Sequence, residues 1–199
     1  MTTSTTRTDA PGWRTLDIVV AAVISVAFGV VFLAWNALYV AATPLFAPIP
    51  ALQAIFYGVW LLPGVLVGLI VRRPGAAFFG NFVAAATSAF LGSTFGADTL
   101  LSGAIQGLGA ELGFAIGLYR AWTLPIAMLA GALPGLGATI HDIPIYYPGV
   151  GPDYWVIYAV AAMASGALIG GGGAWLLTRA LVGTGVLADF AAGRGQREV

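Results

Sequence analysis

Long apolar stretches recur along almost the whole chain, and this pattern limits it to folds that a lipid bilayer can hold. A helix needs about 20 mostly apolar residues to cross the hydrocarbon core. Six stretches reach this length, and we predict a membrane-spanning helix in each: about Thr15 to Ala41, Leu52 to Val71, Ala76 to Phe95, Thr99 to Tyr119, Ala121 to Ile140 and Tyr154 to Leu181. Charged residues make up only 8% of the chain, against about 25% in soluble domains. The sequence therefore predicts an all-α membrane protein.

The basic residues predict how this bundle sits in the membrane. All eight are arginine: Arg7, Arg14, Arg72, Arg73, Arg120, Arg179, Arg194 and Arg197. They precede the first predicted helix, lie between the second and third and between the fourth and fifth, and close the chain. Because cytoplasmic loops are enriched in Lys and Arg, we expect the arginines and both termini on the cytoplasmic side.

Polar segments at the two ends complete the predicted organisation. Residues 1–13 are polar and Thr-rich, which predicts a disordered cytoplasmic tail. Residues 14–185 are expected to form one six-helix substrate-binding domain, and residues 186–199 a second cytoplasmic tail.

Composition excludes several kinds of chemistry. The chain has no cysteine and one histidine, so neither a thiolate metal site nor a multi-histidine site is expected. It has no lysine, which a Walker A loop requires. A nucleic-acid-binding protein would need a basic surface, and the net charge here is zero. We expect no metal, no cofactor and no nucleic-acid partner.

The predicted outer side is rich in acids and rings. Its ionisable residues are Asp98, His141, Asp142 and Asp153, and its rings are Trp35, Tyr39, Tyr57, Trp60, Tyr146, Tyr147, Tyr154, Trp155 and Tyr158. Aromatic residues are common at membrane interfaces, so an interfacial belt is one explanation. The other is an outward-opening pocket that stacks a flat heteroaromatic ligand and favours a cation.

Polar residues inside apolar stretches are the other candidate ligand contacts. Glu111 is the only ionisable residue between about Leu100 and Leu118, and an acid within the membrane is by default a functional hypothesis. The alternative is an acid hydrogen-bonded to a neighbouring helix. Gln106 and Asn81 have the same two explanations: contact with a ligand, or a hydrogen bond to a neighbouring helix. His141 and Asp142 either line a ligand site or form a solvated helix end.

Small residues recur at four-residue spacing on three predicted helices. The first helix carries Ala21, Ser25 and Gly29 on one face, and the fourth and sixth carry similar stripes. Small side chains let helix backbones approach closely. Packing within the bundle explains such stripes, and a partner subunit is a second explanation for the first helix.

Several stretches together resemble the membrane-embedded S components of energy-coupling-factor (ECF) vitamin importers, specifically the YkoE type. The matching stretches are Trp13 to Val19, Phe28 to Val30, Trp35-Asn36, Tyr57 to Trp60, Arg72 to Ala77, Gln106 to Glu111 and Leu124 to Gly131. The runs RRPGAA and QGLGAE are the most specific.

The resemblance implies a six-helix S-component bundle in a prokaryotic cell membrane, with no enzymatic activity of its own. It implies capture of thiamine or hydroxymethylpyrimidine (HMP) from outside, and delivery with a coupling (T) subunit and two ATPase subunits. The expected ligand contacts are Trp35, Asn36, Tyr57, Trp60, Asn81, Gln106, Glu111, His141, Asp142 and Tyr146. The expected coupling-subunit contacts are Ala21, Ser25 and Gly29.

Two other functions stay open on the sequence. One is a stand-alone, gradient-driven transporter of an organic cation, although we see no inverted repeat of the kind that many such transporters contain. The other is an intramembrane enzyme using His141, Asp142 or Glu111, for which no hydrolase motif is present.

Overall fold

The computed structural model describes residues 12–194, and every described element is helical. The elements are α1 (Thr15–Ala42), η1 (Thr43–Phe46), η2 (Pro50–Phe56), α2 (Tyr57–Val71), α3 (Ala76–Phe90), α4 (Asp98–Ile116), α5 (Leu124–Tyr146), α6 (Pro152–Ser165), η3 (Gly166–Gly173), α7 (Ala174–Gly183) and α8 (Ala191–Arg194). The prediction of disorder for the N-terminal tail falls on residues 1–11, outside the described residues, as does the end of the predicted C-terminal tail, 195–199.

Five of the six predicted spans are long and apolar enough to cross a membrane. Within residues 12–194 these are Thr15–Phe46, Pro50–Val71, Asp98–Ile116, Leu124–Tyr146 and Pro152–Gly183. The predicted third span, Ala76 to Phe95, is wrong in length, because α3 has only 15 residues. Gly92 adopts a φ of 93°, and the Ser93 N–H donates to the Ser88 carbonyl at 2.9 Å. This closure ends the helix in the manner of a Schellman motif.

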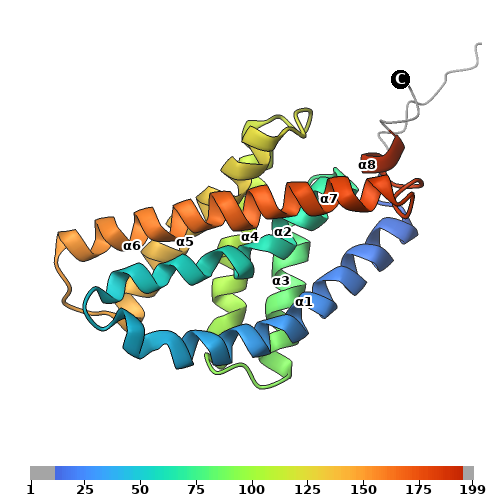
Figure 1. The fold of residues 1–199 in the computed structure, drawn as a ribbon. Coiled ribbons are helices and arrows are strands. Elements are labelled where there is room, and N and C mark those ends of the chain that lie inside the picture. The colour runs from blue at the N-terminus through green and yellow to red at the C-terminus, as the bar shows by residue number, and fades with distance from the viewer. Residues whose placement is uncertain (1–11, 195–199) are drawn as a thin grey trace, which may run out of the picture.

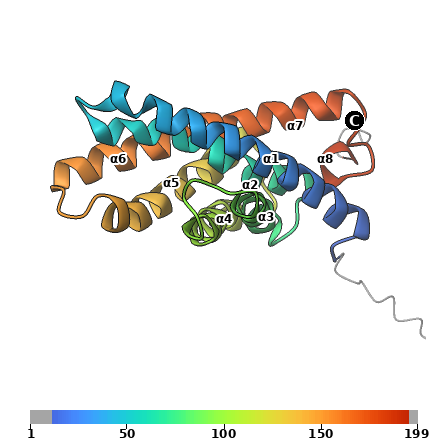
Figure 2. The same ribbon diagram turned by 90° about the horizontal axis from the view of Figure 1, so that it is seen from below.

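Helix α2 is the centre of the bundle. Thirteen of its 15 residues are buried, and it contacts α1, α3, α4, α5 and α7. Figures 1 and 2 show α6, η3 and α7 as one continuous rod alongside it. A side chain at Gly131 or Gly166 would collide with the backbone of the other residue, so the crossing of α5 and η3 depends on two glycines.

Two buried clusters divide the core. One contains the second half of α2 with Phe114 and Ala127, and it extends to Leu187 and Phe190 near the C-terminus. The other contains rings from several helices, including Phe32, Tyr57, Trp60 and Tyr158. Part of the segment predicted as a C-terminal tail therefore packs on the bundle, because Leu187 and Phe190 supply apolar area that is buried there.

The segments that carry the arginines meet beside the first cluster. Figure 1 shows α8 near the start of α1, and Arg14 donates to the Asp189 carbonyl at 2.8 Å. Trp13, within the predicted N-terminal tail, donates from its indole N–H to the Pro74 carbonyl at 3.1 Å. This gathering agrees with the positive-inside pattern, and which side faces the cytoplasm remains a prediction.

Candidate functional site

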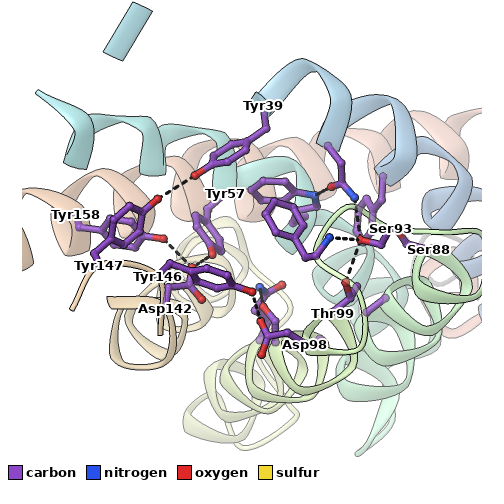
Figure 3. A pocket seen from close by; sticks show the side chains of 18 residues that line it. Tyr39, Tyr57, Ser88, Ser93, Asp98, Thr99, Asp142, Tyr146, Tyr147 and Tyr158 are labelled. Carbon is purple, nitrogen blue, oxygen red and sulfur yellow. Dashed lines mark hydrogen bonds between the residues drawn. The ribbon is translucent and has the colours of Figure 1, made fainter. Parts of the chain in front are cut away.

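A cavity of about 310 Å³ lies inside the second, ring-rich cluster. Side chains from helices α1 to α6 and from the loops after α3 and α5 line it, and Figure 3 shows them around the cavity. The lining residues are Phe32, Asn36, Tyr39, Tyr57, Trp60, Ala85, Ser88, Ser93, Phe95, Asp98, Thr99, Ser102, Gly103, Gln106, Asp142, Tyr146, Tyr147 and Tyr158. This volume is at the small end of ligand pockets, which suits a molecule of one or two rings.

Trp60 is held in the cavity wall by three neighbouring rings and by one hydrogen bond. Its centroid lies 5.3 Å from those of Tyr39 and Tyr57 and 6.0 Å from that of Phe95. Its indole N–H donates to Asn36 Oδ1 at 2.9 Å, and the Asn36 amide donates to Ser93 Oγ at 3.1 Å. Rings at such separations attract one another at tilted or perpendicular angles. The wall is therefore preorganised for contact with a flat molecule.

A buried carboxylate, Asp142, lies at one side of this wall. It accepts hydrogen bonds from the hydroxyl of Tyr158 at 2.7 Å and from the hydroxyl of Tyr57. Its other oxygen lies 2.8 Å from His141 Nδ1. Its side chain is only 6% exposed. All three partners are side chains, and the two tyrosines line the cavity, so either hydroxyl can turn toward a ligand without moving the backbone.

Asp98 adds a second, partly exposed carboxylate to the cavity lining. Its Oδ2 accepts from the Tyr146 hydroxyl at 2.5 Å, and its Oδ1 lies 3.2 Å from His141 Nε2. That contact is close enough for an ion pair but is not aligned as a hydrogen bond. His141 thus lies between two acids, and the lining carries more acidic than basic groups. Such a lining attracts a cation.

Six of the ten predicted ligand contacts line this cavity: Asn36, Tyr57, Trp60, Gln106, Asp142 and Tyr146. His141 lies behind Asp142. Asn81 also lies behind the wall, where its amide donates to Gln106 Oε1 at 3.2 Å. Trp35 is outside the lining, because its indole N–H donates to the Phe56 carbonyl at 3.0 Å.

Glu111 does not line the cavity, and the structure does not support the expectation that it contacts a ligand there. It accepts hydrogen bonds from the backbone N–H groups of Gly75, Ala77 and Phe78 at 2.6, 3.0 and 3.2 Å. These groups begin α3, where a helix has unpaired N–H donors and the positive end of its dipole. The Tyr119 hydroxyl donates to the same carboxylate at 2.8 Å. Glu111, the last residue of the QGLGAE run, therefore caps the helix that begins in the RRPGAA run.

The small-residue stripe of α1 is not available to a partner either. Ala21 and Ser25 are fully buried, and α1 packs on α3. A side chain at Gly29 would lie 2.7 Å from the Ala84 carbonyl oxygen, and it would also collide with Thr87. The expectation that Ala21, Ser25 and Gly29 contact a coupling subunit is therefore not supported, because the stripe lets α1 approach α3.

Sequence reasoning missed most of the hydroxyl groups in the lining. Ser88, Ser93, Thr99 and Ser102 carry no pattern that separates them from other small polar residues. The rings of Tyr39, Tyr147 and Tyr158 and the carboxylate of Asp98 had a signal in the surplus of rings and acids on the predicted outer side. Nothing in the sequence showed which of those rings point inward.

Comparisons with known proteins place this fold in a family. The model of a family described as "ABC-type cobalt transport system, permease component" matches residues 16–137. The "Putative HMP/thiamine permease protein YkoE" of Bacillus subtilis (strain 168) is 34% identical over 183 residues, which is 92% of this chain and 91% of that protein. A solved structure described as an S-component of an ECF transporter superposes with a TM-score of 0.88 at 32% identity, covering 94% of each chain.

These matches extend over nearly the whole chain, including the helices that form the cavity. They agree with a multi-pass protein of the prokaryotic membrane and with a substrate-binding role that is not enzymatic. The chain belongs to the family of YkoE-like S components of ECF transporters.

Proposed function

We propose that the ring-lined cavity captures thiamine or its HMP moiety from outside the cell. We further propose that the chain delivers this ligand inward together with a coupling subunit and two ATPase subunits. The observation that carries the proposal is the pairing of a preorganised aromatic wall with the carboxylates of Asp98 and Asp142 in one cavity. The name of the Bacillus subtilis relative points to the same ligands.

The chemistry of thiamine fits this lining group by group. Its aminopyrimidine is flat and suits the faces of Trp60 and the neighbouring tyrosines. Its thiazolium carries a fixed positive charge, which rings and carboxylates both attract. Asp142 can accept a hydrogen bond from the exocyclic amine after one of its tyrosine donors turns away.

Ser88 offers a further contact for such a ligand. Its hydroxyl is buried and lines the cavity, and it has no hydrogen-bond partner among residues 12–194. A buried hydroxyl without a partner is costly. A ligand that supplies a hydroxyl or a ring nitrogen would remove that cost.

The description of the matching family as a cobalt permease raises a metal ion as the competing cargo. Within the described part of the chain, no three side chains of His, Cys, Asp or Glu group closely enough to hold one. Divalent transition metals prefer clusters of nitrogen, sulfur or carboxylate ligands. The rings and hydroxyls of this cavity favour an organic molecule instead.

A stand-alone, gradient-driven transporter of an organic cation is the second candidate. The observation that favours it is the line of titratable groups from Asp98 through His141 to Asp142. Ionisable groups inside membranes often form proton relays. Uptake of ligand by proteoliposomes that contain this chain alone, driven by a proton gradient, would favour this candidate over an ECF subunit.

Binding to the purified protein tests the proposal directly. In nanodiscs, titration calorimetry would compare thiamine, HMP and the neutral thiazole alcohol of thiamine. We expect saturable binding of thiamine or HMP and none of the thiazole alcohol, and cobalt(II) chloride serves as the fourth arm. Tighter binding of thiamine than of HMP would assign the acids to the thiazolium charge. The proposal would be overturned if neither thiamine nor HMP bound.

A further inference from the structure

A second cavity, of about 200 Å³, lies at the other end of the bundle. It is enclosed by the end of α2, the residues just before α5, and helices α7 and α8. The lining residues are Leu69, Arg72, Trp122, Trp175, Thr178, Arg179, Val182 and Ala192. The lining thus has two arginines and two tryptophans but no acid. Nothing in the proposed transport function uses this cavity.

Each arginine lies over the face of one tryptophan. The guanidinium carbon of Arg72 is 5.7 Å from the ring centroid of Trp122, and that of Arg179 is 4.7 Å from the centroid of Trp175. A guanidinium stacked in this way keeps its N–H edge available. Aligned N–H edges of this kind suit bidentate contact with a phosphate.

These N–H edges have few partners in the protein. Over residues 12–194, neither Arg72 nor Arg179 lies within 4.0 Å of a carboxylate. Among the same residues, the two guanidinium groups make one hydrogen bond, in which Arg72 Nε donates to the Leu69 carbonyl at 3.2 Å. Arg72 is also only partly exposed, and burial lowers the pKa of its guanidinium. Two cations that face one cavity without an anion repel each other.

We propose that this cavity is a phosphate-binding site occupied by the headgroup of an anionic phospholipid. The arginines would hold the phosphate through their N–H edges, and the two indole rings would lie at the level of the membrane interface.

A lipid suits the surroundings better than a free phosphate ion. Beside the cavity, α7 and the residues after it expose Leu176, Leu177 and Val186, with exposed fractions of 64%, 39% and 70%. These side chains lie on the helix that carries Arg179 or in the turn after it, and they would provide an apolar surface for acyl chains. The same end carries the other described arginines, and such basic ends attract the anionic cytoplasmic leaflet.

The retention of lipids by the reconstituted protein tests this proposal. The full chain would be reconstituted in phosphatidylcholine nanodiscs with graded amounts of phosphatidylglycerol. Native mass spectrometry would count the bound lipids, and thermal melting would report stability. We expect the wild type to retain phosphatidylglycerol in preference to phosphatidylcholine and to melt at a higher temperature with it. In the double variant Arg72→Gln/Arg179→Gln the apparent affinity should fall about 25-fold, since each arginine near the surface contributes about fivefold.

Matched variants separate the site from general charge. Arg120→Gln removes an exposed arginine from the same end but outside the cavity, and it should retain the wild-type affinity. Arg179→Gln alone removes an exposed side chain and should cost about fivefold. If the double variant does not fold, the single variant decides, and an unchanged affinity in Arg179→Gln overturns the proposal.

Three further outcomes would also overturn it. Equal losses in Arg120→Gln and Arg179→Gln would show diffuse attraction to the membrane surface. Stabilisation by inorganic phosphate in pure phosphatidylcholine, with no response to phosphatidylglycerol, would assign the site to a soluble anion. No lipid response, together with weaker assembly with the coupling and ATPase subunits in the double variant, would assign the arginines to a partner's carboxylates.

Discussion

Two acids at opposite ends of the bundle show how differently one membrane protein can use a carboxylate. Glu111 accepts three hydrogen bonds from the backbone at the start of α3, and one from Tyr119. Asp142 receives contacts from the side chains of Tyr57, Tyr158 and His141. Both acids are compensated, which an acid within hydrocarbon requires.

The two acids differ in whether their hydrogen-bond partners can move. Backbone N–H groups at a helix start cannot leave Glu111 unless the helix itself shifts. Burial and the bond to Glu111 raise the pKa of Tyr119 to about 12, so its hydroxyl stays protonated and continues to donate. The hydroxyls around Asp142 can rotate about side-chain bonds. Glu111 therefore stabilises the fold, whereas Asp142 remains open to exchange with a ligand.

Replacement of Glu111 by glutamine should give the largest effect on stability. Glu111→Gln removes the charge that three backbone donors face, and it turns an amide N–H₂ toward some of them. Loss of charge-assisted bonds with unpaired donors left behind should lower the free energy of unfolding by about 3 kcal/mol. Thermal melting of the purified protein in detergent measures this loss.

Ligand affinity provides the other half of that test. We expect any Glu111→Gln protein that remains folded to bind thiamine or HMP as the wild type does, because the side chain is outside the cavity lining. A loss of affinity at unchanged melting temperature would reverse the contrast between the two acids.

Replacement of Asp142 by asparagine should show the opposite pattern. Asp142→Asn keeps an oxygen that the two tyrosine hydroxyls can reach, so the melting temperature should change little. Removal of a buried charge opposite a cation costs about 2–5 kcal/mol, and we expect about a hundredfold loss of thiamine affinity by calorimetry. The control is Asp153→Asn, the same change at an exposed position on α6, which should bind normally.

The sequence predicted the helices well because hydropathy over about 20 residues directly reflects the bilayer. It failed for the end of α3, where the turn at Gly92 interrupts a stretch that is still apolar. It could not assign Glu111, whose backbone partners lie 33 to 36 residues earlier and have no side-chain signature.

The same limit applies to the small-residue stripe and to the cavity. A stripe such as Ala21, Ser25 and Gly29 predicts close approach to some helix, but it does not say whether that helix belongs to this chain. The rings that line the cavity and those outside it belong to the same residue types. Only packing separates Trp60, which faces the cavity, from Trp35, which does not.

The two tryptophans allow a sharper test of the cavity end. Trp60→Phe removes the bond to Asn36 and part of the aromatic wall, and we expect about a tenfold loss of affinity. Trp35→Phe makes the same change outside the lining and loses only the bond to the Phe56 carbonyl. Equal affinities in these two variants would mean that Trp60 does not contact the ligand.

Replacement of Ser88 by alanine should have the smallest effect on ligand affinity. It tests whether a hydroxyl that has no partner in the described part of the protein pairs with the ligand. Ser88→Ala removes a buried hydroxyl with no partner in residues 12–194, so the unliganded protein should be at least as stable as the wild type. Loss of one neutral hydrogen bond to the ligand should lower affinity about fivefold. Ser25→Ala is the matched control, because that hydroxyl is equally buried but donates to the Ala21 carbonyl at 2.6 Å. Unchanged affinity in Ser88→Ala would show that the ligand leaves this hydroxyl unpaired, which would restrict the exchangeable groups to those around Asp142.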